Sequence, residues 1–144
     1  MHRFFEDPSA GTLPWDATWV RKLFTTYPRE YGWNSFRVSI GRLPNFWYDI
    51  ADEEGFLIDD EFSYWSLLQF GDQNREAVHL DWSIVEMEKE FTSWIQENWN
   101  HPSIAWWSAS NETTDPMSLE IIDRVRHLDP PRQWENGGWQ KPPR

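Results

Sequence analysis

The chain contains no cysteine, and basic residues are scarce. Without cysteine it can form neither a disulfide nor a thiolate metal site, which leaves its redox environment open. It has 13 lysine and arginine residues against 24 aspartate and glutamate residues, a formal net charge of −11. Binding to nucleic acid or to an anionic membrane needs a basic face, so we expect neither as a partner.

Long apolar runs are absent too. No run approaches the roughly 18 residues that a membrane-spanning helix needs. The opening M-H-R-F-F-E-D-P lacks the basic and apolar segments of a signal peptide, and the sequence leaves a cytoplasmic or a secreted location open. No glycine-rich phosphate loop follows an expected strand, which weighs against a nucleotide-binding sheet. At 144 residues the chain is one domain or a piece of a larger one.

Tryptophan is the residue that the chain has in excess, with 12 copies. One interpretation is that these bulky rings fill the core. The other is that some of them form flat apolar platforms for sugar rings, whose C–H faces are apolar and whose edges bind carboxylates and amides. Indoles also stack on nucleic-acid bases, but the acidic charge argues against that use.

The order of hydrophobic patterns predicts alternating helices and strands. Such alternation is typical of βαβ units with a parallel sheet, so the expected fold class is α/β. A long loop from Phe62 to Leu80 separates the two halves of the pattern. The expected helices are 16–31 (capped by Asp16 or Thr18), 46–54, 81–98 (capped by Asp81) and 115–126, and the expected strands are 33–40, 56–58, 104–107 and, more weakly, 132–136.

Two of the expected strands run into acidic residues. One continues as I-D-D-E (Ile58 to Glu61), the other as S-N-E (Ser110 to Glu112). Such acids can simply cap the next helix, which is an open alternative for Asp59 and Asp60. They can also perform general acid/base chemistry, because glycoside hydrolysis needs two carboxyl groups that flank the scissile bond. A Glu walled by indoles would hold its proton more tightly, as a general acid must.

Four segments, in order, resemble glycoside hydrolase family 2, the family of β-galactosidases, β-glucuronidases and β-mannosidases. N-H-P-S-I-A-W-W-S-A-S-N-E resembles its N-H-P-S-I…W-S…N-E signature, and W-N-S-F-R-V-S-I resembles its G-x-N-x-x-R strand. The other two are F-W-Y-D-I-A-D-E-E-G-F-L-I-D-D-E-F and L-D-P-P-R-Q-W-E-N-G-G-W. The resemblance implies a (β/α)8 barrel that hydrolyses β-glycosides with retention of configuration.

The resemblance also implies roles for single residues. Glu112 corresponds to the general acid/base, and Asn111 to the amide that contacts the sugar near its 2-hydroxyl. Arg37 corresponds to an arginine that lines the site, and Glu61 to an acid at its rim. Trp107 is the aromatic residue expected to contact the substrate. Residues 100–102 precede their strand, on the far side of the barrel, and are expected to be structural.

The chain departs from the family pattern in two ways. Ser39-Ile40-Gly41 stands where many members carry a histidine, so a galactosidase-type site is not assumed. No residue matches the family's nucleophile, a Glu on the seventh strand. We therefore expect residues 1–144 to be a partial family 2 catalytic domain, about half of a TIM barrel from its second to its fifth strand.

Neither a cofactor nor a metal is implied by the resemblance, and a β-glycoside is the expected ligand. The alternative is a non-catalytic carbohydrate-binding or degenerate barrel fragment that needs a partner chain. An open half-barrel would leave strand edges and apolar faces uncovered. Self-association, or docking to a missing second half-barrel, is therefore also expected.

Overall fold

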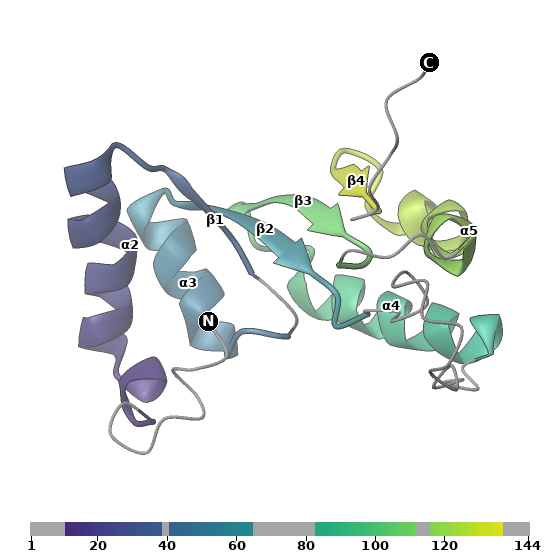
Figure 1. Cartoon of the computed structure of the whole chain (residues 1–144), viewed down its shortest axis with the longest axis horizontal. Helices are drawn as coiled ribbons and strands as arrows, with labels where there is room; N and C mark the ends of the chain where they lie inside the picture. The colour runs from purple at the N-terminus through teal and green to yellow at the C-terminus, as the bar shows by residue number, and fades with distance from the viewer. Residues whose placement is uncertain (1–10, 39–40, 65–82, 112–115, 137–144) are drawn as a thin grey trace, which may run out of the picture.

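The described part of the chain forms an open, wholly parallel sheet of four strands with the order β1-β2-β3-β4. The computed structural model describes residues 11–38, 41–64, 83–111 and 116–136 (Figure 1). This is the architecture of a partial TIM barrel, and it confirms the α/β fold class. The strands are β1 (Ser35–Arg37), β2 (Leu57–Glu61), β3 (Ile104–Ser108) and β4 (Gln133–Glu135). The helices are α2 (Ala17–Tyr31), α3 (Asn45–Glu54), α4 (Ile84–Asn98) and α5 (Pro116–Val125), with 3-10 turns η1 (Leu13–Trp15) and η3 (Arg126–Leu128).

Aromatic side chains join the sheet to the helices. Phe36 of β1 packs on Phe24 of α2, with ring centroids 6.0 Å apart. Trp107 of β3 packs edge-on against Trp94 of α4 at 4.7 Å. Successive side chains of a strand point to opposite faces of the sheet. These contacts therefore define a helix-facing side, and the neighbouring strand residues point to the other side.

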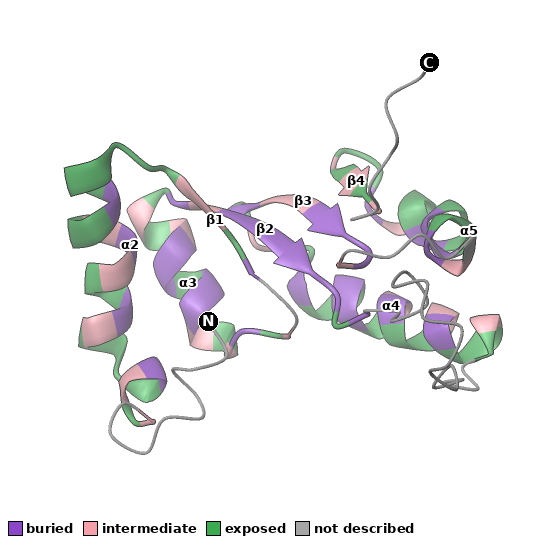
Figure 2. Cartoon of the chain, viewed as in Figure 1, coloured by how far each residue is buried: buried purple, intermediate pink, exposed green. Residues whose placement is uncertain are grey.

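The core lies between the two central strands and the helices. Figure 2 shows buried residues on β2, β3 and the sheet-facing sides of α3 and α4, whereas β1 and β4 are more exposed. Burial of large apolar side chains is the main stabilising term of such a core. The largest of its fully buried residues include Trp47, Tyr48, Ile58, Met87, Phe91, Trp94, Ile95, Ile104, Trp107 and Ile121.

Local signals set most of the helix ends as the sequence predicted. Asp16 caps α2 by accepting the backbone N–H of Thr18 at 2.8 Å. Gly55 ends α3 with φ of 66°, a left-handed conformation that glycine adopts at little cost. The predicted cap of α4 is wrong. Ser83, rather than Asp81, holds that position and forms a capping box with Glu86.

The predicted strands differ in length from those observed. β1 and β4 keep only three residues each, within the predicted ranges 33–40 and 132–136. β2 is longer than predicted, because Asp59, Asp60 and Glu61 belong to the strand itself. Residues 39–40 and most of the predicted loop, 65–82, lie outside the described residues. Among the helices that are described, none is long and apolar enough to cross a membrane.

Candidate active site

The carboxyl ends of the strands are held together by backbone hydrogen bonds. The N–H of Phe62, just after β2, donates to Ser108 O at 2.8 Å. The N–H of Asn111, beyond β3, donates to Tyr64 O at 2.9 Å, and the N–H of Ala109 donates to Glu135 O at 2.7 Å. Two segments that the sequence marked as acidic therefore meet at one edge of the sheet, where ligands of parallel α/β folds bind.

Arg37 and Glu61 are direct partners across β1 and β2. The Nε–H of Arg37 donates to Glu61 Oε2 at 2.7 Å, and Arg37 Nε lies 3.6 Å from Asp59 Oδ2. The Arg37 side chain is 38% exposed, whereas Glu61 and Asp59 are buried. Two carboxylates thus share one arginine, which offsets part of the cost of burying them.

Asp59 is a residue of this cluster that the sequence analysis did not assign to the site. Its Oδ1 accepts a hydrogen bond from Ser108 Oγ at 2.6 Å. Burial raises the pKa of Asp59, and Glu135 adds to that effect, while Ser108, Trp106 and Arg37 oppose it. Its position inside β2 contradicts the helix-cap alternative. Period-two alternation, which places Asp59 and Glu61 on one face, was the signal that could have found it.

Of the Asn111-Glu112 pair, only Asn111 belongs to the described residues. Asn111 is half-buried, and its backbone joins the end of β3 to the segment after β2. Glu112 lies outside the described residues, so its role as general acid/base stays a prediction. Asn111, the residue before Glu112 in the sequence, lies at the carboxyl end of the sheet.

Trp107 lies on the helix-facing side of β3. It is fully buried, and its indole N–H donates to Asp129 Oδ2 at 2.9 Å. Contact with Trp94 of α4 covers it further. This position does not fit the substrate contact predicted for Trp107. Its neighbour Trp106 points to the other face, where its side chain acts to lower the pKa of Asp59.

Residues 100–102 lie at the amino end of β3, away from the cluster around Arg37. His101 Nδ1 is 2.7 Å from Asp52 Oδ2, and the Ser103 N–H donates to Asp52 Oδ1 at 2.7 Å. The guanidinium of Arg132 donates to the carbonyl oxygens of His101 and Ile104, at 2.6 and 2.7 Å. These bonds tie α3, β3 and the start of β4 together, which is a structural role.

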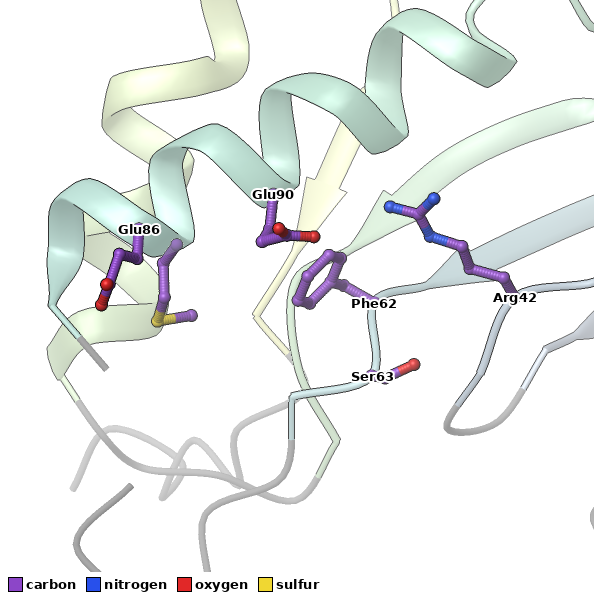
Figure 3. A pocket seen from close by; sticks show the side chains of 6 residues that line it. Arg42, Phe62, Ser63, Glu86 and Glu90 are labelled. Carbon is purple, nitrogen blue, oxygen red and sulfur yellow. The ribbon is translucent and has the colours of Figure 1, made fainter. Parts of the chain in front are cut away.

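A hollow of about 700 Å³ opens beside the end of β2 (Figure 3). It is lined by Arg42, Phe62, Ser63, Glu86, Met87 and Glu90. Phe62 stacks on Phe91 of α4 with ring centroids 3.9 Å apart, so the hollow lies on the helix-facing side of the sheet. It is therefore separate from the Arg37 cluster. In the part of the chain that is described, no three His, Cys, Asp or Glu residues are grouped as metal ligands would be.

Comparisons with known proteins agree with this geometry. The family model "Glycosyl hydrolases family 2, TIM barrel domain" matches residues 19–141. A curated protein of Formosa agariphila that carries a beta-glucuronidase name is 34% identical over 110 residues, which is 76% of this chain and 10% of that protein. A beta-mannosidase A of Aspergillus terreus is 30% identical over 85% of this chain and 13% of its own length.

Solved structures show the same likeness. A beta-glucuronidase of an uncultured Clostridium species has a TM-score of 0.65 and 25% identity, covering 83% of this chain and 21% of that one. The beta-D-glucuronidase of Dictyoglomus thermophilum, at 23% identity and a TM-score of 0.69 over 83% of this chain and 22% of its own, supports the fold alone. The chain spans about a tenth of the length of the curated relatives given above. With the family model matched along most of its length, the chain belongs to glycoside hydrolase family 2, as part of the TIM barrel domain.

Proposed function

We propose that this chain carries the acid/base part of a glycosidase site that hydrolyses β-glycosides. The observation that carries the proposal is the family match over residues 19–141, which includes the Asn111-Glu112 pair. The meeting of the β2 and β3 ends supports it, because it brings Asn111 to the same edge as Arg37 and Glu61. The relatives, which carry glucuronidase, galactosidase and mannosidase names, act on this class of bond.

In the proposed mechanism Glu112 works twice. It first donates a proton to the glycosidic oxygen while the bond to the anomeric carbon breaks, and a second carboxylate attacks that carbon to form a covalent glycosyl-enzyme. Glu112 then takes a proton from water, which attacks the same carbon and releases the sugar with its configuration retained. We propose that the second carboxylate comes from a part of the barrel that these 144 residues do not include.

The residues around Glu112 would hold the sugar. Asn111 would bond a ring hydroxyl, as the family motif implies. Arg37 binds Glu61 through its Nε. Its two terminal guanidinium nitrogens would line the substrate site together with Glu61. Trp106 would supply the aromatic surface that was predicted for Trp107, because it points to the face that carries Asp59.

The reaction class is tested by completing the barrel. The matching segment of the Formosa agariphila relative is replaced by this chain, and the chimera is assayed with aryl β-glucuronide, β-galactoside and β-mannoside. We expect turnover of at least one substrate, with the β-anomer formed first, as proton NMR of the fresh product would show. A first product of inverted configuration contradicts the proposed mechanism. Binding of sugar by a folded chimera without turnover favours the non-catalytic alternative.

A further inference from the structure

Strand β2 presents three consecutive acids to two different sides of the sheet. Asp59 and Glu61 point to the face that holds Arg37 and Ser108. Asp60, between them, points to the helices and has no exposed surface. A lone buried carboxyl group is costly unless it is bonded, so its presence between two site acids calls for a reason.

Asp60 is bonded by two helices at once. The hydroxyl of Tyr48 on α3 donates to Asp60 Oδ1 at 2.9 Å. The indole N–H of Trp94 on α4 donates to Asp60 Oδ2 at 2.9 Å. Each carboxylate oxygen thus accepts from its own neutral donor, and both donors are buried. These two bonds link the helix-facing side of β2 to α3 and α4.

The pairing of β2 with β3 is irregular directly before these acids. Ile58 pairs with Ile104, but Asp59 pairs with Trp106, so β3 contains one extra residue, Ala105. A bulge of this kind changes the direction of the side chains that follow, and bulges are frequent beside active sites. A slip of one residue would turn Asp59 and Glu61 to the helix side. The register beyond the bulge therefore needs an anchor.

We propose that Asp60 is a positioning residue: its bonds to Tyr48 and Trp94 fix how β2 presents Asp59 and Glu61 to Arg37 and Ser108. The inference rests on the proposed function only in treating the Arg37 side as the substrate face. The contacts themselves do not depend on hydrolysis, so the test below can fail or succeed whether or not Glu112 is the acid/base.

The surroundings of Asp60 make the proposal measurable. Burial raises the pKa of Asp60 to about 7, while the hydrogen bonds from Tyr48 and Trp94 oppose the rise. Asp59 on the same strand raises it further, and Arg42 from the segment before α3 lowers it. Burial also raises the pKa of Tyr48 above its ordinary value, so Tyr48 stays protonated near neutral pH. On its other side, Tyr48 stacks on the ring of His101 with centroids 5.3 Å apart, and His101 Nδ1 lies 2.7 Å from Asp52 Oδ2.

The test follows two nitrogen-bound protons in the ¹⁵N-labelled 144-residue chain by NMR from pH 5 to 9. We expect the Trp94 indole N–H and the Arg37 Nε–H to shift with one common midpoint near pH 7. In Asp60→Asn both steps disappear, whereas a step caused by His101 or Asp59 would remain. The indole N–H of Trp107, which donates to Asp129, is the control. Its chemical shift should follow the same pH curve in the native chain and in Asp60→Asn. An Arg37 signal that lacks this step, or keeps it in Asp60→Asn, overturns the proposal.

Two milder variants cover the case in which Asp60→Asn fails to fold. Tyr48→Phe and Trp94→Phe each remove one donor to the Asp60 carboxylate and leave the acid in place. Losing a donor to the charged form raises the pKa of an acid. We therefore expect the midpoint read at Arg37 Nε–H to move to higher pH in both. An unchanged midpoint in both variants, with Arg37 still bonded to Glu61, contradicts a positioning role for Asp60.

Discussion

At the scale of single residues, Asp60 gives the chain a pH dependence of opposite sign to that of a salt-bridged acid. Burial raises the pKa of Asp60 to about 7, against an ordinary value of 3.8. Between these two pH values the folded chain keeps a proton that the unfolded chain has released. The contribution of Asp60 to the free energy of unfolding therefore falls as the pH rises from about 4 to about 7.

The Asp60→Asn variant should lose this component, because asparagine does not titrate. Urea unfolding at a series of pH values from 4 to 8 measures it as the difference in unfolding free energy between the native chain and the variant. We expect that difference to shrink steadily as the pH rises. The variant Asp49→Asn, at an exposed position of α3, serves as the control and should leave the slope unchanged. A native slope retained in full by Asp60→Asn would argue against the raised pKa.

The sequence motifs predicted that these residues lie near the strand ends, but not which face of the sheet each side chain points to. Arg37 and Glu61 came from two separate motifs, and the structure brings them within 2.7 Å of each other. Trp106 and Trp107 adjoin in one strand, so they point to opposite faces. The motif alone could not say which faces the helices. Packing against Trp94 decides it, and that contact joins distant parts of the sequence.

At the scale of elements, α4 shows how much a short local pattern contributes. Ser83 Oγ accepts the Glu86 backbone N–H at 3.2 Å, and the Glu86 carboxylate accepts the Ser83 backbone N–H at 3.2 Å. These bonds satisfy donors that the first turn of a helix otherwise leaves free. The S-x-x-E spacing was visible in the sequence, but Asp81 is an equally good cap by residue type, and only the spacing to Glu86 separates them.

The Ser83→Ala variant should therefore lower the free energy of unfolding by about 1 kcal/mol, the usual effect of losing an N-cap. Denaturant unfolding, followed by tryptophan fluorescence, measures the change. Ser93→Ala is the matched control, since its hydroxyl only bonds the Glu97 side chain on the exposed face of the same helix. An equal loss of unfolding free energy in both variants would contradict a stabilising role for the capping box.

Strand boundaries were the least predictable part of the fold. The pattern predicted eight residues for β1 and three for β2, whereas the structure has three and five. Carboxylates are rare in strand interiors, so D-D-E was interpreted as the end of the strand. Tertiary contacts override that preference here, because Arg37, Ser108, Tyr48 and Trp94 all bond the acids of β2.

At the scale of the whole molecule, β1 and β4 are the outer strands of the described sheet, and each has one strand neighbour. Edge strands offer unpaired backbone groups to another chain. Large apolar side chains near these edges are also exposed, among them Trp33 at 56% and Leu119 at 54%. Closed barrels of this class have eight strands, so a four-stranded piece has surfaces that another piece can cover.

We therefore expect the isolated chain to associate in solution. Light scattering over a range of protein concentrations should give a mass that exceeds the 17.4 kDa of one chain and grows with concentration. In the chimera that completes the barrel, the same edges are paired within one molecule, and the segment should no longer drive association. A clean monomer of the isolated chain at high concentration would refute this expectation.

The central claim is that Glu112 is the general acid/base, and one kinetic comparison tests it most directly. The completed-barrel chimera and its Glu112→Gln variant are assayed with two aryl β-glycosides that share a sugar but differ in leaving-group acidity. Proton donation matters most for the poor leaving group, so kcat/KM for that substrate should fall by about 100-fold or more. For the good leaving group the fall should be much smaller. Equal kcat/KM values for chimera and variant with the poor leaving group would contradict the account.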